Sequence, residues 1–156
     1  MLMGSKEYAQ KIIKDFEGFR EDLHNGFVRA YYDGGHVPTI GWGTTFYADG
    51  SAVSITDVVS LQTCIDAFNH EFNEKYNSIK SNSKVPLSNN QVAALTSFAY
   101  NVGLTALYNS TLWHLLQSGA DKQTVAAQFD RWVYDNHEYV PGLASRRAKE
   151  KTIFLT

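Results

Sequence analysis

The chain has 156 residues, enough for one domain with a sizeable core. Hydrophobic residues make up 44% and charged residues 19%, a composition too apolar for a disordered chain. Its 14 basic and 16 acidic residues leave a net charge of −2, which excludes the strongly positive field that drives nonspecific nucleic-acid binding. We therefore expect no nucleic-acid partner.

Cysteine content and hydropathy predict where the chain is made. Cys64 is the only cysteine, so no disulfide framework within the chain holds the fold together. No run approaches the ~18 consecutive apolar residues of a membrane-spanning helix, and the N-terminal residues lack the apolar core of a signal peptide. We expect a monomer made in the cytoplasm, without a transmembrane segment.

The N-terminal residues predict a short helix followed by a hairpin. Ser5 is a candidate N-cap, and Gly18 is a natural helix stop. Between them and just beyond, apolar residues recur at helical spacing, at Tyr8, Ile12, Ile13, Phe16 and Phe19.

The hairpin is indicated by β-forming residues on both sides of a turn. Residues Phe27–Tyr32 precede the turn signal Asp33-Gly34-Gly35, and Val37–Thr45 forms the returning strand. A second turn signal at Asp49-Gly50 predicts a third, short strand over Ser51–Val53.

A long helix is predicted after Thr56, which is a candidate N-cap. The helical stripe consists of Val58, Leu61, Ile65, Phe68, Phe72, Tyr76 and Ile79. A helix of this length suits a strut between two lobes.

Beyond this strut the chain reads as helical. Ser88-x-x-Gln91 is a capping box for a helix that runs through about Val102 and stops at Gly103. Shorter helices are predicted near Ser110–Gln117 and Lys122–Tyr134. Pro141-Gly142 then precedes a basic final helix, so the fold class is α+β and mostly helical.

A glutamate at the end of the first predicted helix is the first candidate for chemistry. Glu17 lies between Phe16 and Gly18-Phe19. The negative end of the helix dipole and an apolar environment both disfavour a carboxylate, which predicts a raised pKa for Glu17. Such a residue suits a general acid, although a glutamate at a helix end is also an ordinary solvent-facing residue.

Two further residues are uninformative singly. Asp33 precedes two glycines, and Asp-Gly is first of all a turn signal. Thr39 is a β-forming residue within a predicted strand. They become informative only through the pattern that they make with Glu17.

Together these segments resemble the active-site segment of the phage-type lysozymes, glycoside hydrolase family 24. The resemblance rests on Glu17-Gly18-Phe19-Arg20, Tyr32-Asp33-Gly34-Gly35 and Thr39-Ile40-Gly41-Trp42-Gly43-Thr44-Thr45. In that family a glutamate after the first helix, an aspartate at the hairpin and a threonine one strand later form the catalytic centre. The resemblance therefore implies that Glu17, Asp33 and Thr39 are catalytic.

The resemblance extends through the second half of the chain. The similar stretches are Pro86-Leu87-Ser88-x-x-Gln91, Ala94-Leu95-x-Ser97-Phe98-x-Tyr100-Asn101-Val102-Gly103, Ser110-Thr111-Leu112 and Pro141-Gly142-Leu143-x-x-Arg146-Arg147-x-x-Glu150. It implies one lysozyme-like catalytic domain over residues 1–156 with a two-lobed fold. A small N-terminal β-hairpin lobe (about 1–56), a long connecting helix (about 57–80) and a helical C-terminal lobe (about 81–156) are expected.

The implied activity is that of an endolysin-type lysozyme, an N-acetylmuramidase. Such an enzyme hydrolyses the β-1,4 bond between N-acetylmuramic acid and N-acetylglucosamine in bacterial peptidoglycan. Its partner would be the glycan strands of the periplasmic cell wall. Without a signal peptide, the chain would need a holin-like membrane permeabiliser to reach them.

The implied mechanism divides the work between two carboxyl groups. Glu17 would protonate the leaving oxygen. Asp33, with Thr39 donating or accepting a hydrogen bond, would position and activate a water molecule on the opposite face. For this family that arrangement implies inversion at the anomeric carbon.

Several side chains are candidates for binding the glycan. Tyr31, Tyr32, Trp42 and Tyr47 are aromatic residues of the hairpin region, where core packing is the competing role. Tyr32, Trp42 and Asn101 are the predicted substrate-binding residues. No cofactor is implied and no metal site is expected, because no metal-binding spacing relates the histidines His24, His36, His70, His114 and His137.

Two features depart from the family pattern. Asp33 follows Glu17 by 16 residues, a longer interval than in compact members, with Asp22–Phe27 as extra chain. This leaves Glu21 and Asp22 as alternative second carboxylates.

The second departure is the net charge of −2, because many wall-degrading lysozymes are basic. A local basic patch is one interpretation of the cations near the C-terminus, and a solvated helix end is the other. The residues concerned are Arg146, Arg147, Lys149 and Lys151.

Three alternative functions remain open at this point. A lytic transglycosylase uses a single glutamate and forms an anhydro product without water. An inactive or weakly active relative would serve as a peptidoglycan-binding module. An antibacterial effector would use the same hydrolytic chemistry.

Overall fold

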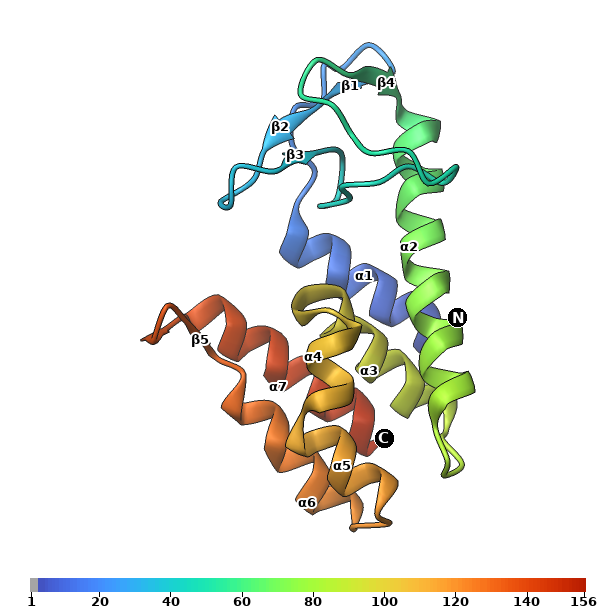
Figure 1. Ribbon diagram of the computed structural model, residues 1–156, viewed down its shortest axis with the longest axis vertical. Coiled ribbons are helices and arrows are strands. Elements are labelled where there is room, and N and C mark those ends of the chain that lie inside the picture. The colour runs from blue at the N-terminus through green and yellow to red at the C-terminus, as the bar shows by residue number, and fades with distance from the viewer. Residues whose placement is uncertain (1–2) are drawn as a thin grey trace. The chain divides into compact units, whose positions relative to one another are not determined.

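The computed structural model describes residues 3–156, so Met1 and Leu2 lie outside the description. Helices make up most of its regular secondary structure and short antiparallel strands the rest, which confirms the predicted α+β class (Figure 1). The helices are α1 (Ser5–Glu17), α2 (Leu61–Asn82), α3 (Asn89–Val102), α4 (Leu104–Asn109), α5 (Thr111–Gln117), α6 (Lys122–Ala127), the 3₁₀ helix η1 (Gln128–Arg131) and α7 (Pro141–Leu155). The strands are β1 (Phe27–Arg29), β2 (Tyr31–Tyr32), β3 (Pro38–Thr39), β4 (Val58–Ser60), β5 (Tyr134–Asp135) and β6 (Glu138–Tyr139).

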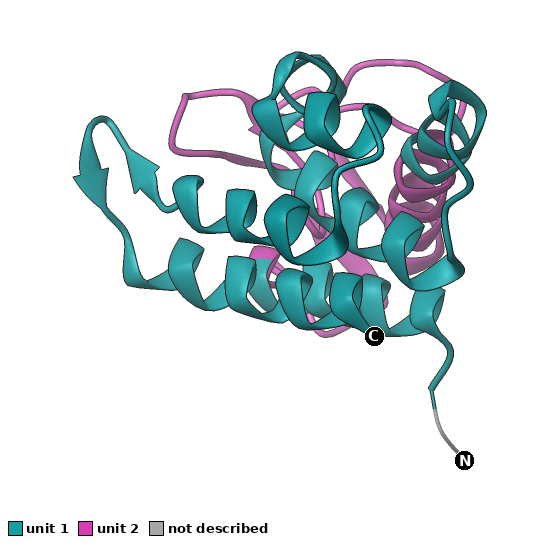
Figure 2. Ribbon diagram, turned by 90° about the horizontal axis from the view of Figure 1, so that it is seen from below, with its two compact units in different colours: residues 1–16, 75–156 teal, residues 17–74 magenta. Residues whose placement is uncertain are grey.

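The chain divides into two compact units, which have different colours in Figure 2. Unit 2 is the continuous segment Glu17–Glu74 and holds strands β1 to β4. Unit 1 combines Met1–Phe16 with Lys75–Thr156 and holds the later helices. Within residues 3–156, no helix is both long and apolar enough to cross a membrane.

The strands of unit 2 form two separate pairs rather than the one predicted hairpin. Strand β2 pairs with β3 across the Asp33 turn, with Tyr31 opposite Thr39. Strand β1 instead pairs with the distant β4, with Val28 opposite Val59. The predicted third strand over 51–53 is reduced to a single bridge between Phe46 and Ala52.

A small apolar core holds these strands. Its buried members are Val28, Ala30, Ile40, Val53 and Cys64, with Phe19, Trp42, Tyr47 and Val59 packed against them. Val28 supplies the inward residue of β1, while its neighbours in that strand are exposed. Because so few residues form this core, the two strand pairs depend on contacts with the loops and with α2.

Helix α2 begins later than predicted, at Leu61 instead of just after Thr56. The Ser60 hydroxyl accepts a hydrogen bond from the Thr63 amide, so Ser60 performs the capping role that was assigned to Thr56. Val58 belongs to β4, where it lies opposite Arg29. Val58 matches the helical spacing of the apolar stripe only by chance, because one valine at the end of the stripe is compatible with either a strand or a helix.

Helix α3 is the buried centre of unit 1, and its predicted bounds are confirmed. Ser88 and Gln91 form the reciprocal capping box, and the Gly103 amide bonds to the Ala99 carbonyl at the other end. All of Gln91–Tyr100 is buried. Helix α3 packs mainly against α7.

The chain after Gly103 differs from the prediction in two places. Helix α4 was not predicted, because its six residues are too short to show a period. The predicted helix over Lys122–Tyr134 ends earlier, as α6 and η1, and its last residue lies in the hairpin β5–β6. Asn136 and His137 both have positive φ values, as a tight hairpin turn requires.

Both interpretations of the cations near the C-terminus, a basic patch and a solvated helix end, are wrong for two of the four residues. Arg146 and Arg147 are only 2% and 1% exposed, and both pair with the fully buried Glu150. The Arg147 Nε atom lies 2.7 Å from a Glu150 carboxylate oxygen. Burial raises the pKa of the Glu150 carboxyl, and the two guanidinium groups oppose that rise.

This cluster of Arg146, Arg147 and Glu150 also connects α7 to α3. Arg146 donates to the Ser97 carbonyl at 2.8 Å, and Arg147 donates to the Asn101 side-chain oxygen at 2.8 Å. A buried carboxylate that compensates two guanidinium groups is costly to remove alone, because the remaining charges stay away from water.

We therefore expect Glu150→Gln to lower the free energy of unfolding by roughly 3–5 kcal/mol, measured by urea denaturation. The exposed pair of Lys151 with Asp130 provides the control, and Asp130→Asn should cost no more than about 1 kcal/mol. Equal losses for the two variants would contradict the central role assigned to Glu150.

Candidate active site

Glu17 is the last residue of α1, and the helix ends there because Gly18 adopts a left-handed conformation with φ of +71°. The Glu17 side chain is half-buried. Helix termination thus directs this carboxyl group toward the strands and loops of unit 2, to which Glu17 belongs.

The loop after β3 comes very close to Glu17. Gly43 has a φ of +84°, and a Cβ atom added there would lie 2.7 Å from the Glu17 Oε2 atom. A side chain at position 43 would be strained by the backbone conformation, and it would have to displace the Glu17 carboxyl group. Within the Gly41-Trp42-Gly43 turn, the second glycine permits the backbone to pass beside the carboxyl group.

Asp33 occupies the turn between β2 and β3, where its side chain organises the backbone. Its Oδ1 atom accepts hydrogen bonds from the amides of Gly35 at 2.9 Å and Val37 at 2.8 Å. Both of these bonds use the same oxygen. Within the described residues, Oδ2 has no hydrogen-bond partner, so it is available to a ligand.

Thr39 lies on β3 and is 2% exposed. Its hydroxyl donates to the Val37 carbonyl at 2.8 Å, which commits its only proton. The Thr39 Oγ1 atom can therefore only accept from a further partner. Val37 thus bonds to both side chains, to Asp33 through its amide and to Thr39 through its carbonyl.

These three predicted catalytic residues line one cavity of about 160 Å³ within unit 2. The other lining residues are Arg20, Tyr31, Gly34 and Gly43. The cavity is large enough for several water molecules or for part of a sugar ring.

Arg20 and Tyr31 complete the electrostatics of this cavity, and the sequence reasoning gave them no catalytic role. The Arg20 guanidinium lies over the Tyr31 ring, 5.3 Å from its centroid. Burial raises the pKa of the Tyr31 hydroxyl, Arg20 lowers it, and Glu17 and Asp33 raise it. All three charges therefore act on one hydroxyl group. The arginine is visible in the sequence beside Glu17, but its position over Tyr31 depends on the fold.

The cavity combines one carboxyl group that can exchange a proton with two oxygen atoms that can accept hydrogen bonds. Glu17 is placed to give or take a proton beside the Gly43 backbone. Asp33 Oδ2 and Thr39 Oγ1 can each accept a hydrogen bond from a water molecule. A carboxylic acid on one side and a held water molecule on the other is the requirement for hydrolysing a glycosidic bond.

The predicted substrate-binding residues have different surroundings. Tyr32 is 43% exposed and stacks on His36 with the ring centroids 3.9 Å apart. Trp42 packs against Phe19 and Phe68 in the core of unit 2 and does not line the 160 Å³ cavity. Tyr47, the other aromatic candidate, bonds to Asp57 at 2.7 Å, so it supports the loop.

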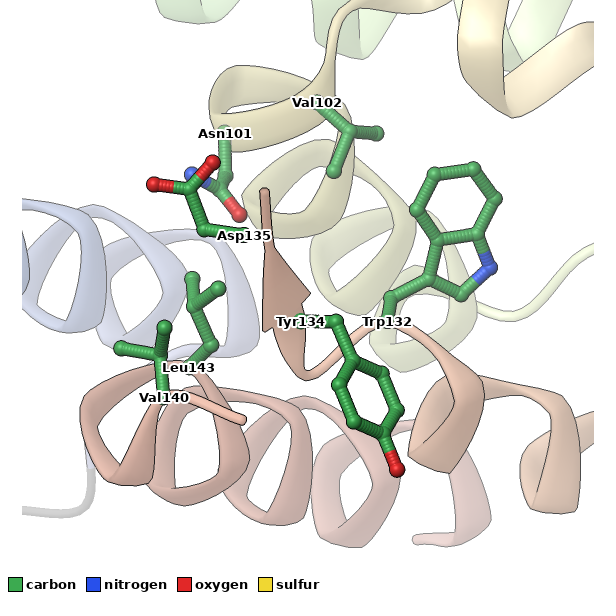
Figure 3. A pocket seen from close by; sticks show the side chains of 7 residues that line it. All are labelled: Asn101, Val102, Trp132, Tyr134, Asp135, Val140 and Leu143. Carbon is green, nitrogen blue, oxygen red and sulfur yellow. The ribbon is translucent and has the colours of Figure 1, made fainter. Parts of the chain in front are cut away.

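Asn101 belongs to unit 1, where it lines a separate cavity of about 490 Å³ (Figure 3). Its side-chain oxygen accepts from Arg147, which fixes the orientation of the amide. Trp132, Tyr134 and Asp135 also line this cavity and were not singled out in the sequence. The only sequence signal for them is a run of aromatic and acidic residues. Trp132 and Tyr134 fall within the helix predicted over Lys122–Tyr134, so the run was interpreted as part of that helix.

Metal-binding geometry gives no competing interpretation of these cavities. No group of three or more histidine, cysteine, aspartate or glutamate side chains among residues 3–156 is arranged to hold a metal ion. Burial raises the pKa of the Cys64 thiol to about 11, so this cysteine is a core residue without thiolate character.

A family model described as phage lysozyme matches residues 14–150. The chain belongs to the phage lysozyme family. Membership confirms the resemblance drawn from the sequence motifs, and the matched range includes Glu17, Asp33, Thr39 and Asn101.

Individual members of the phage lysozyme family are similar along the whole chain. The endolysin of Bacillus phage B103 is 35% identical over 155 residues, covering 99% of this chain and 55% of the relative. The chain thus spans about half the length of that protein. The endolysin of Acyrthosiphon pisum secondary endosymbiont phage 1 is 30% identical, covering 97% of this chain and 98% of the relative.

A solved structure within the family has the same fold. The endolysin from Escherichia coli O157:H7 phage FAHEc1 is similar with a TM-score of 0.78 and 28% identity. The match covers 99% of this chain and 95% of that one. It confirms the predicted lysozyme-like fold class.

The contact between Gly43 and Glu17 generates a test by substitution. Gly43→Ala and Gly50→Ala both place an alanine at a left-handed position, but nothing lies within 4 Å of a Cβ at Gly50. We expect each variant to lose about 1 kcal/mol of stability from the backbone strain. Only Gly43→Ala should displace the Glu17 carboxyl group, because a flexible side chain yields before the backbone does.

The displacement is measured by the carbon-13 chemical shift of the Glu17 carboxyl, with urea denaturation for the stability. An unchanged Glu17 shift in Gly43→Ala would show that the close approach does not position this carboxyl group.

Proposed function

We propose that this chain is an endolysin-type lysozyme that hydrolyses the β-1,4 bond between N-acetylmuramic acid and N-acetylglucosamine in bacterial peptidoglycan. The proposal makes Glu17, Asp33 and Thr39 the catalytic residues. Membership of the phage lysozyme family supports the reaction class and the substrate.

The observation that carries the proposal is the shared cavity of these residues. Glu17, Asp33 and Thr39 come from a helix end, a turn and a strand, yet all three line the same 160 Å³ space. A purely structural role for the Asp33 turn would need Oδ1 alone, which already accepts from two amides. The remaining oxygen faces no partner among residues 3–156, which suits a group reserved for a ligand.

In the proposed reaction, Glu17 begins protonated and donates its proton to the glycosidic oxygen as that bond breaks. Asp33 Oδ2 and Thr39 Oγ1 accept the two hydrogens of one water molecule, so that its oxygen lone pair faces the anomeric carbon. Asp33 takes the proton as the new C–O bond forms. The water arrives opposite the leaving group, so the configuration inverts.

Arg20 has a supporting role in this scheme. Its positive charge is held over the Tyr31 ring, where it lowers the pKa of the Tyr31 hydroxyl and so opposes the effect of burial. A base and an acid in one small cavity need unequal proton affinities, and Arg20 lines the same cavity as both carboxyl groups.

The proposal also includes where the enzyme works. Its substrate lies beyond the cytoplasmic membrane of the host bacterium, in the cell wall of the periplasm. A chain made in the cytoplasm therefore requires a holin-like permeabiliser to reach the glycan strands. The names of the relatives, which are endolysins of phages, support a role in host lysis over that of an antibacterial effector.

The catalytic assignment is tested by isosteric substitution. Glu17→Gln removes the proton donor, and Asp33→Asn removes the base, with little change in shape. We expect each to slow the clearing of purified Gram-negative sacculi by about 10²–10⁴-fold, measured by turbidity. Circular dichroism is the control that checks whether each variant is folded.

Glu21→Gln is the matched control, because Glu21 is an exposed carboxylate near Glu17 in sequence that does not line the cavity. It should keep near wild-type activity. Full activity in Asp33→Asn would exclude Asp33 as the base, and an inert wild type that binds sacculi would favour a peptidoglycan-binding module.

Product analysis provides a separate test of the water-activating role. We expect NMR of the first products to show inverted anomeric configuration, because water attacks opposite the leaving oxygen. Mass spectrometry should find hydrolysed muropeptides. Products lighter by one water would indicate a lytic transglycosylase, and retained configuration would rule out water activation by Asp33.

A further inference from the structure

We propose that Arg20 is a specificity-determining residue, which binds a carboxylate carried by the substituent of muramic acid in the glycan strand. The inference rests on the proposed function for the identity of the substrate. Muramic acid differs from glucosamine by a lactyl ether, whose carboxyl group is either free or joined to a peptide with carboxylates of its own. A guanidinium group at the catalytic cavity would therefore distinguish the two sugars of the strand by charge.

The charge of unit 2 makes such a cation necessary. Its residues 17–74 include nine aspartates and glutamates but only two basic residues, so its net charge is −7 with neutral histidines. A negative field of this size opposes the approach of an anionic substrate, because like charges raise the free energy of association. A carboxylate that enters a cavity of this unit therefore needs a cation close to it.

The two basic residues of unit 2 are Arg20 and Arg29, and only one of them is at the cavity. Arg20 lines the 160 Å³ space together with Glu17 and Asp33. Arg29 does not line this space and is exposed on β1, opposite Val58. Among residues 3–156, Arg20 is thus the one basic residue that lines the catalytic cavity.

The Arg20 guanidinium is held in place without an ion pair. Its central carbon lies 5.3 Å from the centroid of the Tyr31 ring, and within the described part of the chain no carboxylate pairs with it. A contact with the face of a ring restricts the guanidinium but uses none of its N–H donors. These donors therefore remain for a ligand.

Tyr31 connects this support to the catalytic strands. The residue pairs with Thr39 across β2 and β3, and its hydroxyl donates to the Gly41 carbonyl at 3.4 Å. Glu17, Asp33 and Arg20 all influence the pKa of this hydroxyl, so the cation lies within electrostatic range of both carboxyl groups. A carboxylate bound by Arg20 would thus be placed close to the groups that perform the reaction.

A carboxylate matches Arg20 better than the uncharged groups of the strand do. The planar guanidinium can donate two parallel hydrogen bonds to the two oxygens of one carboxylate. Hydrogen bonds between charged partners are about twice as strong as neutral ones. The hydroxyl groups of N-acetylglucosamine would therefore gain less from the same donors.

Binding is tested by NMR titration of the full chain, with N-acetylmuramic acid and its lactyl carboxamide as probes. The amides of Gly34 and Gly43 report on the cavity, because both residues line it. We expect wild type to bind the acid about five-fold more tightly than the carboxamide, and Arg20→Gln to bind both equally. The comparison of the two probes on wild type stands without any variant.

A second pair of probes identifies the source of the carboxylate. N-acetylmuramoyl-alanyl-glutamate is compared with the same compound amidated on its carboxyl groups. A preference within the first pair supports the lactyl group as the ligand of Arg20, and a preference within the second pair alone supports the peptide. Equal binding within both pairs would overturn the inference.

Arg29→Gln is the matched control, since it removes the same charge from the same unit at a residue that does not line the cavity. It should keep the preference for the carboxylate. An equal loss of preference in Arg29→Gln and Arg20→Gln would show a diffuse field in place of a specific contact, and would also overturn the inference.

A kinetic experiment separates this inference from the proposed function. Soluble glycan strands are compared with the same strands after their carboxyl groups have been converted to amides. The ratio of kcat/KM for acidic over amidated strands should be about five in wild type and about one in Arg20→Gln, because any effect on the chemical step is common to both substrates.

The two possible failures give different results. An inert wild type that still prefers the acidic probes through Arg20 would overturn the proposed function and keep the inference. An active enzyme with no preference for carboxylates, in binding or in kcat/KM, would overturn the inference and keep the function.

Discussion

The close approach of the Gly43 backbone to the Glu17 carboxyl group is the constraint on which the candidate catalytic cavity depends. A Cβ atom at position 43 would lie only 2.7 Å from Oε2, so any residue other than glycine would have to displace the carboxyl group. That approach places a helix end beside a loop of the same unit, although 26 positions separate them in the chain. Because the neighbouring Trp42 ring packs against Phe19 and Phe68, the core of unit 2 holds the loop in place.

Around this contact, backbone hydrogen bonds decide which side-chain atoms remain for chemistry. Asp33 commits one oxygen to the amides of Gly35 and Val37, and Thr39 commits its proton to the Val37 carbonyl. Each side chain thereby becomes rigid and keeps one acceptor for a ligand. The same groups that shape the turn therefore preorganise the candidate site, which lowers the cost of ordering it when substrate binds.

In unit 1, buried charged groups likewise fix the orientation of a side chain that lines a cavity. Glu150 compensates Arg146 and Arg147, and Arg147 in turn orients Asn101 at the rim of the larger cavity. In the sequence, Arg146 and Arg147 look like part of a solvated basic helix, but in the structure they are buried and bond to α3. They therefore do not form a basic patch on the surface.

Local signals in the sequence by themselves determined the fold class, the ends of α1 and α3, the Asp33 turn and the family motifs, because caps, glycines and turn residues act over a few positions. Only the tertiary structure decided the pairing of β1 with β4, the start of α2 and the burial of Arg147. Strand partners and buried ion pairs depend on contacts between residues far apart in the chain, and periodicity carries no record of those contacts. For the same reason the sequence could nominate Glu17, Asp33 and Thr39 but could not show that they share one cavity.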